Sequence, residues 1–225
     1  MMTNNFDKLS KEYYDYLEEN VYSSVISDAL DSLGYRNQTT DPDLRPLDSK
    51  KVLVGRAKTA QVTEINREPK KPYVKLIDLL DSVGQGDVII ASLGGSNRSG
   101  FFGELLGTVT SAAGGRGAIV DGMIRDAKQL KNMGFPVFTK GFKPTDSFGR
   151  NDVVDNDVII DCGGVTVSPG DLVIGDVDGV VIVPKDLEDQ VVQKAFNKVN
   201  GEDNMREELK KGMKISEAFK KYGIL

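Results

Sequence analysis

The spacing of apolar residues predicts a chain that begins and ends in helices, with strands and helices alternating between them. Near the N-terminus, apolar residues about four positions apart predict a helix over residues 9–33 that stops at Gly34. A helical pattern returns from Leu187 to the end. Between these segments we expect helices at 72–80, from Gly103 and at 127–133, and strands at 52–63, 87–91, 118–121, 136–139, 158–161, 165–167, 172–175 and 179–183. This order favours an α/β fold with a mixed sheet, organised as a single domain over residues 1–225 with helical segments at 1–34 and 185–225.

Two turns share one sequence pattern. Residues 84–87 (GQGD) and 168–171 (SPGD) each place a glycine and an aspartate directly before an apolar run. Both are predicted to be tight corners that lead into a strand. The likeness does not extend further along the chain, so it indicates repeated turn chemistry and not a duplicated domain.

The composition excludes several kinds of active site. The chain has no histidine, which rules out Ser-His-Asp and Cys-His arrangements and imidazole ligation of zinc, copper or iron. The single cysteine, Cys162, excludes an intrachain disulfide and a cysteine zinc cluster, and we expect it to be a small core residue. Any metal must therefore be held by oxygen, which favours Mg²⁺ or Mn²⁺. Acid–base chemistry must come from carboxylates, Lys, Tyr or metal-bound water.

Charge and hydropathy narrow the range of partners. A net charge of −5 and a pI near 5.0 argue against a nucleic-acid-binding protein, because no domain-wide basic surface is present. The start of the chain lacks a basic segment followed by an apolar run, and no apolar stretch approaches the roughly 20 residues that span a bilayer. We therefore expect a cytoplasmic protein that binds neither nucleic acid nor membranes.

Glu104 and the adjacent pair Arg125-Asp126 are the main candidates for chemistry. The twenty residues between them contain one predicted helix and one predicted strand, so both ends fall at junctions between elements of a βα unit. Two carboxylates and a guanidinium at such junctions could hold a hard metal ion together with a small anion. The alternative is structural, with Asp126 as the N-cap of the next helix and Glu104 as a favourable first-turn acid. Arg125 would then form an ordinary surface ion pair.

The glycine-rich run at residues 94–100 precedes the helix that starts at Gly103. The run lacks the G-x-G-x-x-G spacing and a suitable acid after a second strand, which argues against a nucleotide or S-adenosylmethionine site. We expect a flexible loop that exposes the N-terminus of the helix. The unpaired amides of residues 103–106 would then form an anion site.

Other polar residues have simpler interpretations. Lys128 and Lys140 could form a Schiff base with a ketone, but a solvated role is the expectation for both. Glu202 and Arg206 lie four residues apart on the C-terminal helical segment, where an ion pair is the default interpretation. Apolar residues of the same segment could pack on the chain's own domain or on a neighbouring subunit. These are Val191, Val192, Ala195 and Val199.

Four segments, in this order, closely resemble one protein family. They are 103–106 (GELL), 117–126 (GAIVDGMIRD), 134–138 (GFPVF) and 163–171 (GGVTVSPGD). The likeness runs from about Ser27 to Pro184 and more loosely to Glu202. The family includes the regulator of ribonuclease E activity A and the class II 4-hydroxy-4-methyl-2-oxoglutarate/4-carboxy-4-hydroxy-2-oxoadipate aldolases. Its members have also been labelled demethylmenaquinone methyltransferases.

This resemblance implies a fold, an assembly and a metal site. The fold would be an α/β/β sandwich of the swivelling-domain type, assembled as a homotrimer or a dimer of trimers. In the catalytic branch of the family, an acid followed after twenty residues by Arg-Asp holds a divalent metal. By that pattern Asp126 would be the direct ligand, and Glu104, at a position that is often Asp, would hold metal-bound water. Glu202, from the C-terminal helix of a neighbouring subunit, would be a further acid near the metal.

The resemblance also implies a substrate and a reaction. Arg125 would contact the pyruvoyl group of a small 2-oxo acid, whose carboxylate would lie on the amides of Gly103, Glu104, Leu105 and Leu106. The implied reaction is Mg²⁺- or Mn²⁺-dependent cleavage of a 4-hydroxy-2-oxo acid to pyruvate, or decarboxylation of oxaloacetate, through a pyruvate enolate. The alternative is a non-catalytic regulator that binds a ribonuclease. The acid after the Arg is absent from the enteric regulator and present here as Asp126, which favours the catalytic branch.

Overall fold

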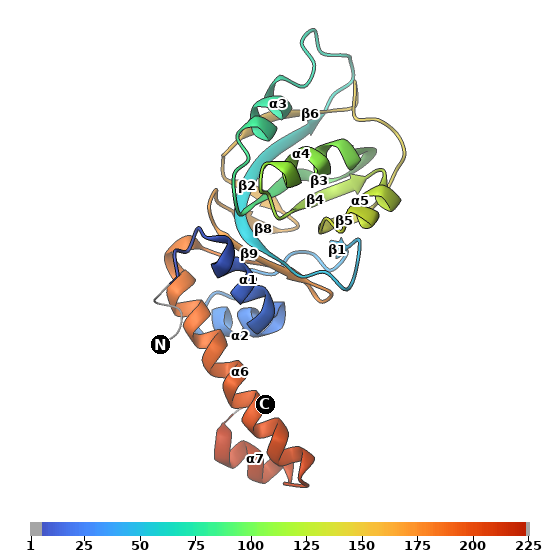
Figure 1. The fold of residues 1–225 in the computed structure, drawn as a ribbon. Helices are drawn as coiled ribbons and strands as arrows, with labels where there is room; N and C mark the ends of the chain where they lie inside the picture. Colours follow the sequence, from blue (N-terminus) through green and yellow to red (C-terminus); the bar gives the residue numbers. More distant parts are fainter. Residues whose placement is uncertain (1–5, 224–225) are drawn as a thin grey trace.

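A large mixed sheet forms the centre of the protein in the computed structural model, which describes residues 6–223 (Figure 1). Its strand order is β1-β5-β4-β3-β2-β9-β10, and β6 pairs with the far end of β2. The strands are β1 (Arg45–Pro46), β2 (Leu53–Glu64), β3 (Asp87–Phe102), β4 (Gly117–Ile124), β5 (Val137–Phe142), β6 (Asn151–Asn156), β9 (Leu172–Asp176) and β10 (Gly179–Val183). β2 to β5 run parallel, and the other pairings are antiparallel. The outermost parts of the expected terminal segments, residues 1–5 and 224–225, lie outside the described residues.

Helices and a small second sheet cover the two faces of the main sheet. The helices are α1 (Lys11–Asn20), α2 (Ser23–Ser32), α3 (Val74–Asp81), α4 (Glu104–Ala112), α5 (Ala127–Met133), η2 (Lys185–Leu187), α6 (Glu188–Lys210) and α7 (Ile215–Tyr222). The second sheet pairs β7 (Ile160–Cys162) with β8 (Val165–Val167). None of the helices in the described part combines the length and apolar character needed to cross a membrane.

Alternating side chains of the parallel strands explain the layered arrangement. In β3, Ile89 packs in the core shared with α3, α4 and α5, while its neighbours Val88 and Ile90 pack in the core shared with β7 and β8. A parallel strand that is buried on both faces must be apolar at successive positions, as the run at 88–91 is. The predicted α/β/β sandwich with mixed sheets and helical termini is confirmed.

Two boundaries of the predicted elements are wrong for local reasons. The helix expected over 9–33 is two helices, because the extended backbone of Val21 and Tyr22 separates α1 from α2. The strand expected at 87–91 continues to Phe102 as β3, so residues 94–100 are not a flexible loop. Three shifts of register against β4 absorb the glycine-rich run, and Gly94 and Gly95 adopt the positive φ values of 60° and 73° that favour glycine there. The prediction also missed the short edge strand β1 and the strand β6.

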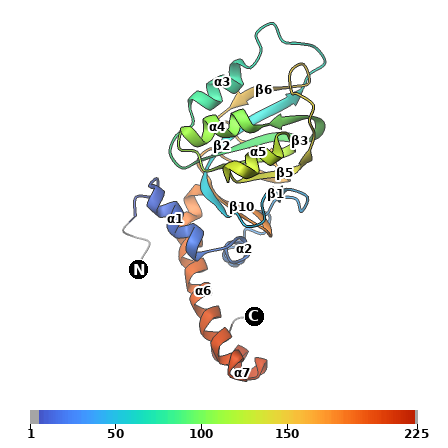
Figure 2. The same ribbon diagram turned by 45° about the vertical axis from the view of Figure 1, so that its right-hand side comes forward.

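The C-terminal helix α6 has two different environments along its length. Its first half buries Val191, Val192 and Ala195 against α1, α2 and the β9–β10 part of the sheet, so this stripe packs on its own domain. Its second half and α7 extend away from the body of the protein, and both views show this (Figures 1 and 2). There Met205 is buried, while Phe219 of α7 stays half exposed.

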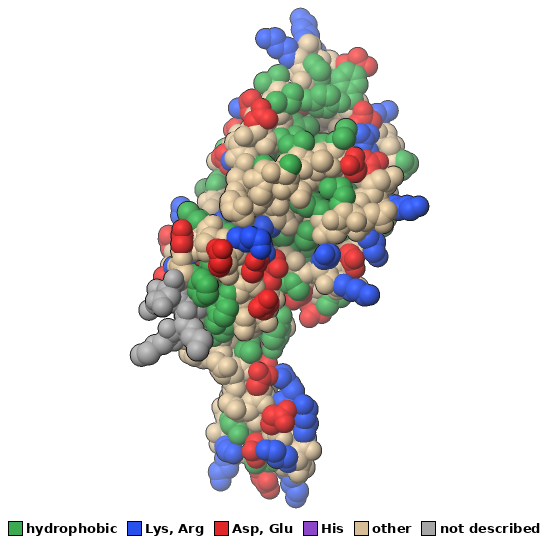
Figure 3. All heavy atoms as spheres, viewed as in Figure 1, with side chains coloured by type: hydrophobic (Ala, Val, Ile, Leu, Met, Phe, Trp, Pro, Cys, Tyr) green, Lys and Arg blue, Asp and Glu red, His purple; other side chains and the backbone are tan. Residues whose placement is uncertain are grey.

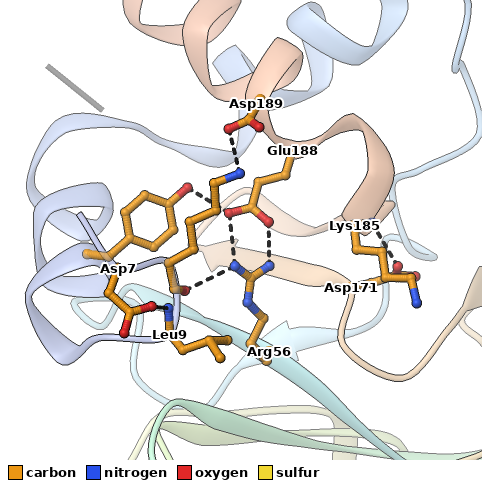
Figure 4. Close-up of polar contacts among 9 residues, drawn as sticks. Asp7, Leu9, Arg56, Asp171, Lys185, Glu188 and Asp189 are labelled. Atoms are coloured by element: carbon orange, nitrogen blue, oxygen red, sulfur yellow. Dashed lines mark hydrogen bonds and ion pairs between the residues drawn. The ribbon is translucent and has the colours of Figure 1, made fainter. Parts of the chain in front are cut away.

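A buried ion pair joins α6 to the central strand β2 (Figure 4). The Arg56 guanidinium donates from Nη1 to Glu188 Oε2 at 2.5 Å and from Nη2 to Glu188 Oε1 at 2.9 Å. The Glu188 side chain is only 3% exposed, and it also accepts from the Tyr13 hydroxyl of α1 at 2.8 Å. Arg56 Nη2 donates further to the Lys8 carbonyl. One carboxylate therefore connects α1 and the start of α6 to the sheet.

We predict that Glu188→Gln lowers the free energy of unfolding by about 3–5 kcal/mol, because Arg56 would remain buried without a counter-charge. Urea denaturation measures this change. Asp189→Asn, at the residue that follows Glu188, is the matched control. It removes an exposed ion pair with Lys8 and should lower the free energy of unfolding by less than about 1 kcal/mol. Equal losses in the two variants would contradict the structural role assigned to Glu188.

Candidate active site at the start of α4 and α5

Parallel pairing of β3 with β4 brings the predicted site residues together. Phe102 at the end of β3 pairs with Ile124 at the end of β4, and the Arg125 amide donates to the Phe102 carbonyl at 2.9 Å. Helix α4 begins at Glu104, two residues after the end of β3, and α5 begins at Ala127, three residues after the end of β4. Glu104 and the pair Arg125-Asp126 therefore lie side by side at the carboxyl edge of the parallel strands, where ligands bind in open α/β sheets.

Asp126 has an unusual backbone and an unusual partner. Its φ of 54° and ψ of 34° lie in the left-handed region, which is uncommon for residues other than glycine and marks local strain. Asp126 occupies the N-cap position of α5, but its side chain makes no capping hydrogen bond there. Its Oδ2 instead accepts from the Glu104 amide at 3.1 Å, at the start of α4. Asp126 is therefore the N-cap residue of α5 by position, as the structural alternative expected, but its carboxylate caps α4 and not α5. Glu104 lies in the first turn of α4, as that alternative also expected.

Gly103 permits this close approach. A Cβ atom at Gly103 would lie 2.6 Å from Asp126 Oδ2 and 3.1 Å from Arg125 Cγ, so any other residue would displace the carboxylate. The φ of −136° is accessible to all residues, so the requirement is for space and not for backbone freedom. The glycine thus keeps the Asp126 carboxylate against the first turn of α4.

The amides of the first turn of α4 are only partly free. Gly107 makes the first intrahelical bond, to the Gly103 carbonyl at 3.1 Å, and the Glu104 amide is already taken by Asp126. The amides of Leu105 and Leu106 therefore stay available to a ligand, because they precede the first intrahelical hydrogen bond. The Glu104 carboxylate accepts from Thr108 Oγ1 at 3.0 Å, which holds the acid beside its own helix.

Arg125 is held by two carboxylates. Its Nη1 donates to Asp146 Oδ1 at 3.0 Å, and its Nε lies 3.8 Å from Asp126 Oδ2. The Arg125 side chain remains 35% exposed, so a ligand can reach it. Asp146, in the segment between β5 and β6, is the residue that the sequence reasoning missed. It belongs to a polar stretch, Thr145-Asp146-Ser147, with no distinguishing pattern.

Glu202 lies apart from the other acids within one chain. It belongs to the half of α6 that extends away from the sheet (Figure 1), and its Oε2 accepts from the Tyr22 hydroxyl at 2.6 Å. Burial and this carboxylate raise the pKa of Tyr22 to about 12. The expected Glu202–Arg206 ion pair is wrong, because Arg206 pairs with Asp203 and Glu202 lies 3.8 Å from Lys198. Within residues 6–223 no three side chains of the His, Cys, Asp and Glu types form a group that could hold a metal.

Lys140 has surroundings that exclude both roles considered for it. Its side chain is 13% exposed, so it is not solvated, and its Nζ lies 2.9 Å from Asp121, 3.2 Å from Asp41 and 3.5 Å from Asp43. Burial lowers the pKa of the ammonium, but these carboxylates outweigh it and hold the pKa above its usual range. A Schiff base needs the neutral amine, so Lys140 is unsuited to that chemistry. Cys162 is buried as predicted, and burial raises the pKa of its thiol.

Comparison with known proteins shows the family of the chain. The family model described as "RraA-like: Aldolase/RraA" matches residues 23–182, which include the strands of the main sheet up to β9, most of β10, and the acids of α4 and α5. The chain belongs to the RraA-like family. A Halalkalibacterium halodurans protein, provisionally named a 4-hydroxy-4-methyl-2-oxoglutarate aldolase, is 32% identical over 88% of this chain and 90% of its own length.

Solved structures extend the RraA-like comparison. RraAS2 of Streptomyces coelicolor, described as an unusual member of the RNase ES inhibitor RraA protein family, is 31% identical with a TM-score of 0.77, over 88% of this chain and 98% of its own. An uncharacterized Pseudomonas syringae protein is 27% identical with a TM-score of 0.81, over 95% of this chain and 99% of its own. The likeness therefore includes proteins named for enzymatic and for regulatory roles.

The strained backbone of Asp126 gives a prediction for stability. Asp126→Gly and Asp126→Ala both remove the hydrogen bond to the Glu104 amide, but only glycine adopts the left-handed backbone freely. We expect the glycine variant to be more stable than the alanine variant by about 1 kcal/mol. Thermal or urea unfolding of both variants measures the difference. An alanine variant as stable as the glycine variant would show that residue 126 is not held in this conformation in solution.

Proposed function

We propose that this RraA-like protein is a divalent-metal-dependent lyase that releases pyruvate from a small 2-oxo acid. Its substrates would be a 4-hydroxy-2-oxo acid, cleaved between C3 and C4, or oxaloacetate, which loses its distal carboxylate. The observation that carries the proposal is the strained Asp126, whose carboxylate is held between the first turn of α4 and Arg125. Strain of this kind persists only where the surrounding structure enforces it, and it clusters at functional sites.

The donor set fits Mg²⁺ or Mn²⁺. Asp126 and Glu104 would hold the ion, since hard cations prefer carboxylate oxygen and the chain offers no imidazole. Mg²⁺ sites commonly use one or two carboxylates, with water and substrate completing the shell, so two acids from one chain are sufficient. The space kept open at Gly103 allows the Asp126 carboxylate to stand against α4. When bound, the metal would supply positive charge beside the 2-keto oxygen of the substrate.

The residues of this chain would bind and orient the substrate. The amides of Leu105 and Leu106, at the positive end of the α4 dipole, would bind the C1 carboxylate. Arg125 would donate hydrogen bonds to the keto oxygen or the adjacent carboxylate, and these bonds strengthen as negative charge develops on that oxygen. The Arg125 fork is already oriented by Asp126 and Asp146, so little reorganisation accompanies the reaction.

Assembly is part of the same proposal. The exposed apolar side chains Leu105 and Val109 of α4 and Met133 of α5 lie beside the site, and Figure 3 shows apolar surface over this region. The second half of α6 and α7 project from the body of the protein (Figure 2), and α7 leaves the apolar side chains of Ile215 and Phe219 about half exposed. We infer a homotrimer or a dimer of trimers in which the C-terminal helices contact a neighbouring subunit. Glu202 would then approach the neighbour's metal through Oε1, since Oε2 accepts from the Tyr22 hydroxyl.

A regulatory function is the second candidate. It is favoured by the 31% identity to RraAS2, which is described as a member of an RNase inhibitor family. A protein of this kind would bind a ribonuclease and would need no metal. Metal-dependent release of pyruvate separates the two functions, because a binding protein has no reason to catalyse it.

We predict that the protein decarboxylates oxaloacetate only when Mg²⁺ or Mn²⁺ is present. The rate is corrected for the decarboxylation of oxaloacetate by the metal ion without protein. EDTA should abolish the remaining pyruvate formation, and excess Mg²⁺ should restore it. A coupled lactate dehydrogenase assay measures pyruvate. Asp126→Gly should lower turnover by at least ~10²-fold, the scale of losing one stabilising group at such a site. Undiminished activity in a thoroughly chelated sample, or in folded Asp126→Gly, would contradict the proposed metal site.

The assembly is testable by sedimentation. We expect a mass of three or six chains of 24.5 kDa at micromolar concentration. Glu202→Gln should leave this mass unchanged while lowering turnover, if Glu202 acts across a subunit boundary. A fully active monomer would exclude a shared site.

A further inference from the structure

The Arg125 guanidinium makes one hydrogen bond, through Nη1, and one longer ion-pair contact, through Nε. Nη1 donates to Asp146 at 3.0 Å, and Nε lies 3.8 Å from Asp126. No hydrogen bond within residues 6–223 is donated by Nη2. A guanidinium is planar, with its donors in fixed directions, so holding two edges determines where the third points. Nη2 is therefore the donor available to a ligand at the start of α4.

Asp146 is rigidly placed because the chain is anchored on both sides of it. The Lys143 amide donates to the Ile124 carbonyl at 2.8 Å, directly before Arg125. The Gly100 amide donates to the Thr145 carbonyl at 2.9 Å, and the Asn151 amide donates to the Ser147 carbonyl at 2.9 Å. Ser147 is itself buried. A short side chain between two anchored neighbours keeps its carboxylate in place at little entropic cost.

The residues that follow Asp146 also hold it in place. Arg150 Nη1 donates to the Asp146 carbonyl at 3.0 Å, and the Phe148 ring lies 6.0 Å from the ring of Tyr73, centre to centre. Tyr73 precedes α3 with a left-handed φ of 63°, a second strained residue near the site. Burial raises the pKa of the Tyr73 hydroxyl, and the charges of Asp146 and Arg125 act on it in opposite directions.

We propose that Asp146 is a positioning residue that holds Arg125 so that Nη2 faces the ligand between Asp126 and the start of α4. The role rests on the proposed function, since orientation matters only if Arg125 contacts a substrate. Both side chains of the pair are more than a third exposed, and such pairs contribute little to stability. Asp146 therefore acts on the direction of the guanidinium and not on the folding of the protein.

The test is a double-mutant cycle with a matched control. Asp146→Asn should lower kcat for oxaloacetate by ~10- to 100-fold, the range for loss of a group that orients a site residue, with a melting temperature within a few degrees of wild type. In an Arg125→Lys background the same change should alter the remaining kcat less than ~2-fold, because its target is gone. Asp155→Asn removes another half-exposed acid, 3.9 Å from Lys75, and should leave kcat unchanged in both backgrounds.

Crystal structures of wild type and Asp146→Asn separate failure of this inference from failure of the proposed function. We expect the Arg125 guanidinium to turn away from its wild-type orientation in Asp146→Asn. An unchanged guanidinium, or equal losses of kcat in the two backgrounds, would overturn the positioning role. If wild type releases no pyruvate, the proposed reaction fails, and the orientation of Arg125 in the two crystal structures alone decides the role of Asp146.

Discussion

The hydrogen bond from the Glu104 amide to the Asp126 carboxylate joins the first residues of two helices that follow neighbouring parallel strands. It forms only because β3 and β4 end in register, at Phe102 and Ile124, and because Gly103 leaves room for the carboxylate. The same constraint places Asp126 in a left-handed backbone and sets Arg125 beside it. The chemistry proposed for the protein depends on this corner, and the sandwich around it serves to hold the two strand ends together.

The corner concentrates negative charge near one guanidinium. Asp126 and Asp146 lie against Arg125, and Glu104 opens the helix beside them, an arrangement that is unfavourable for an anionic substrate unless a cation is added. A divalent ion would reverse that balance and make the site attractive to a 2-oxo acid. The excess of acids therefore supports the proposed metal, and a chain without histidine can bind such an ion only through oxygen.

Much of the fold was predictable because local chemistry and burial agree along the chain. The two glycine–aspartate corners are an example: the Asp87 and Asp171 carboxylates each accept the amide three residues earlier at 2.8 Å, and each turn has a glycine with φ near 90°. The bulged part of β3 was not predictable, since glycine and polar residues in a strand resemble a loop when its pairing with β4 is unknown. The extended break at Val21-Tyr22 was not predictable either, because the helical spacing of apolar residues continues across it.

The candidate site was predictable in part. The spacing of Glu104 and Arg125-Asp126, together with the family resemblance, was enough to bring these residues together. The capping of α4 by the Asp126 carboxylate was not foreseen, because it depends on contact between two strand ends. Asp146 and the acids around Lys140 were missed because they come from segments distant in sequence, and no local pattern distinguishes them from surface acids.

Binding of Mn²⁺ in the presence of oxalate tests the central claim most directly. Oxalate is a planar dianion that resembles the enolate of pyruvate, so it should bind together with the metal at the Asp126 corner. Electron paramagnetic resonance titration should show one Mn²⁺ per chain in wild type, with binding at least ~10-fold weaker in Asp126→Gly, a variant chosen because its backbone conformation is allowed. Equal Mn²⁺ affinity in the two proteins, or no binding to wild type, would contradict the account.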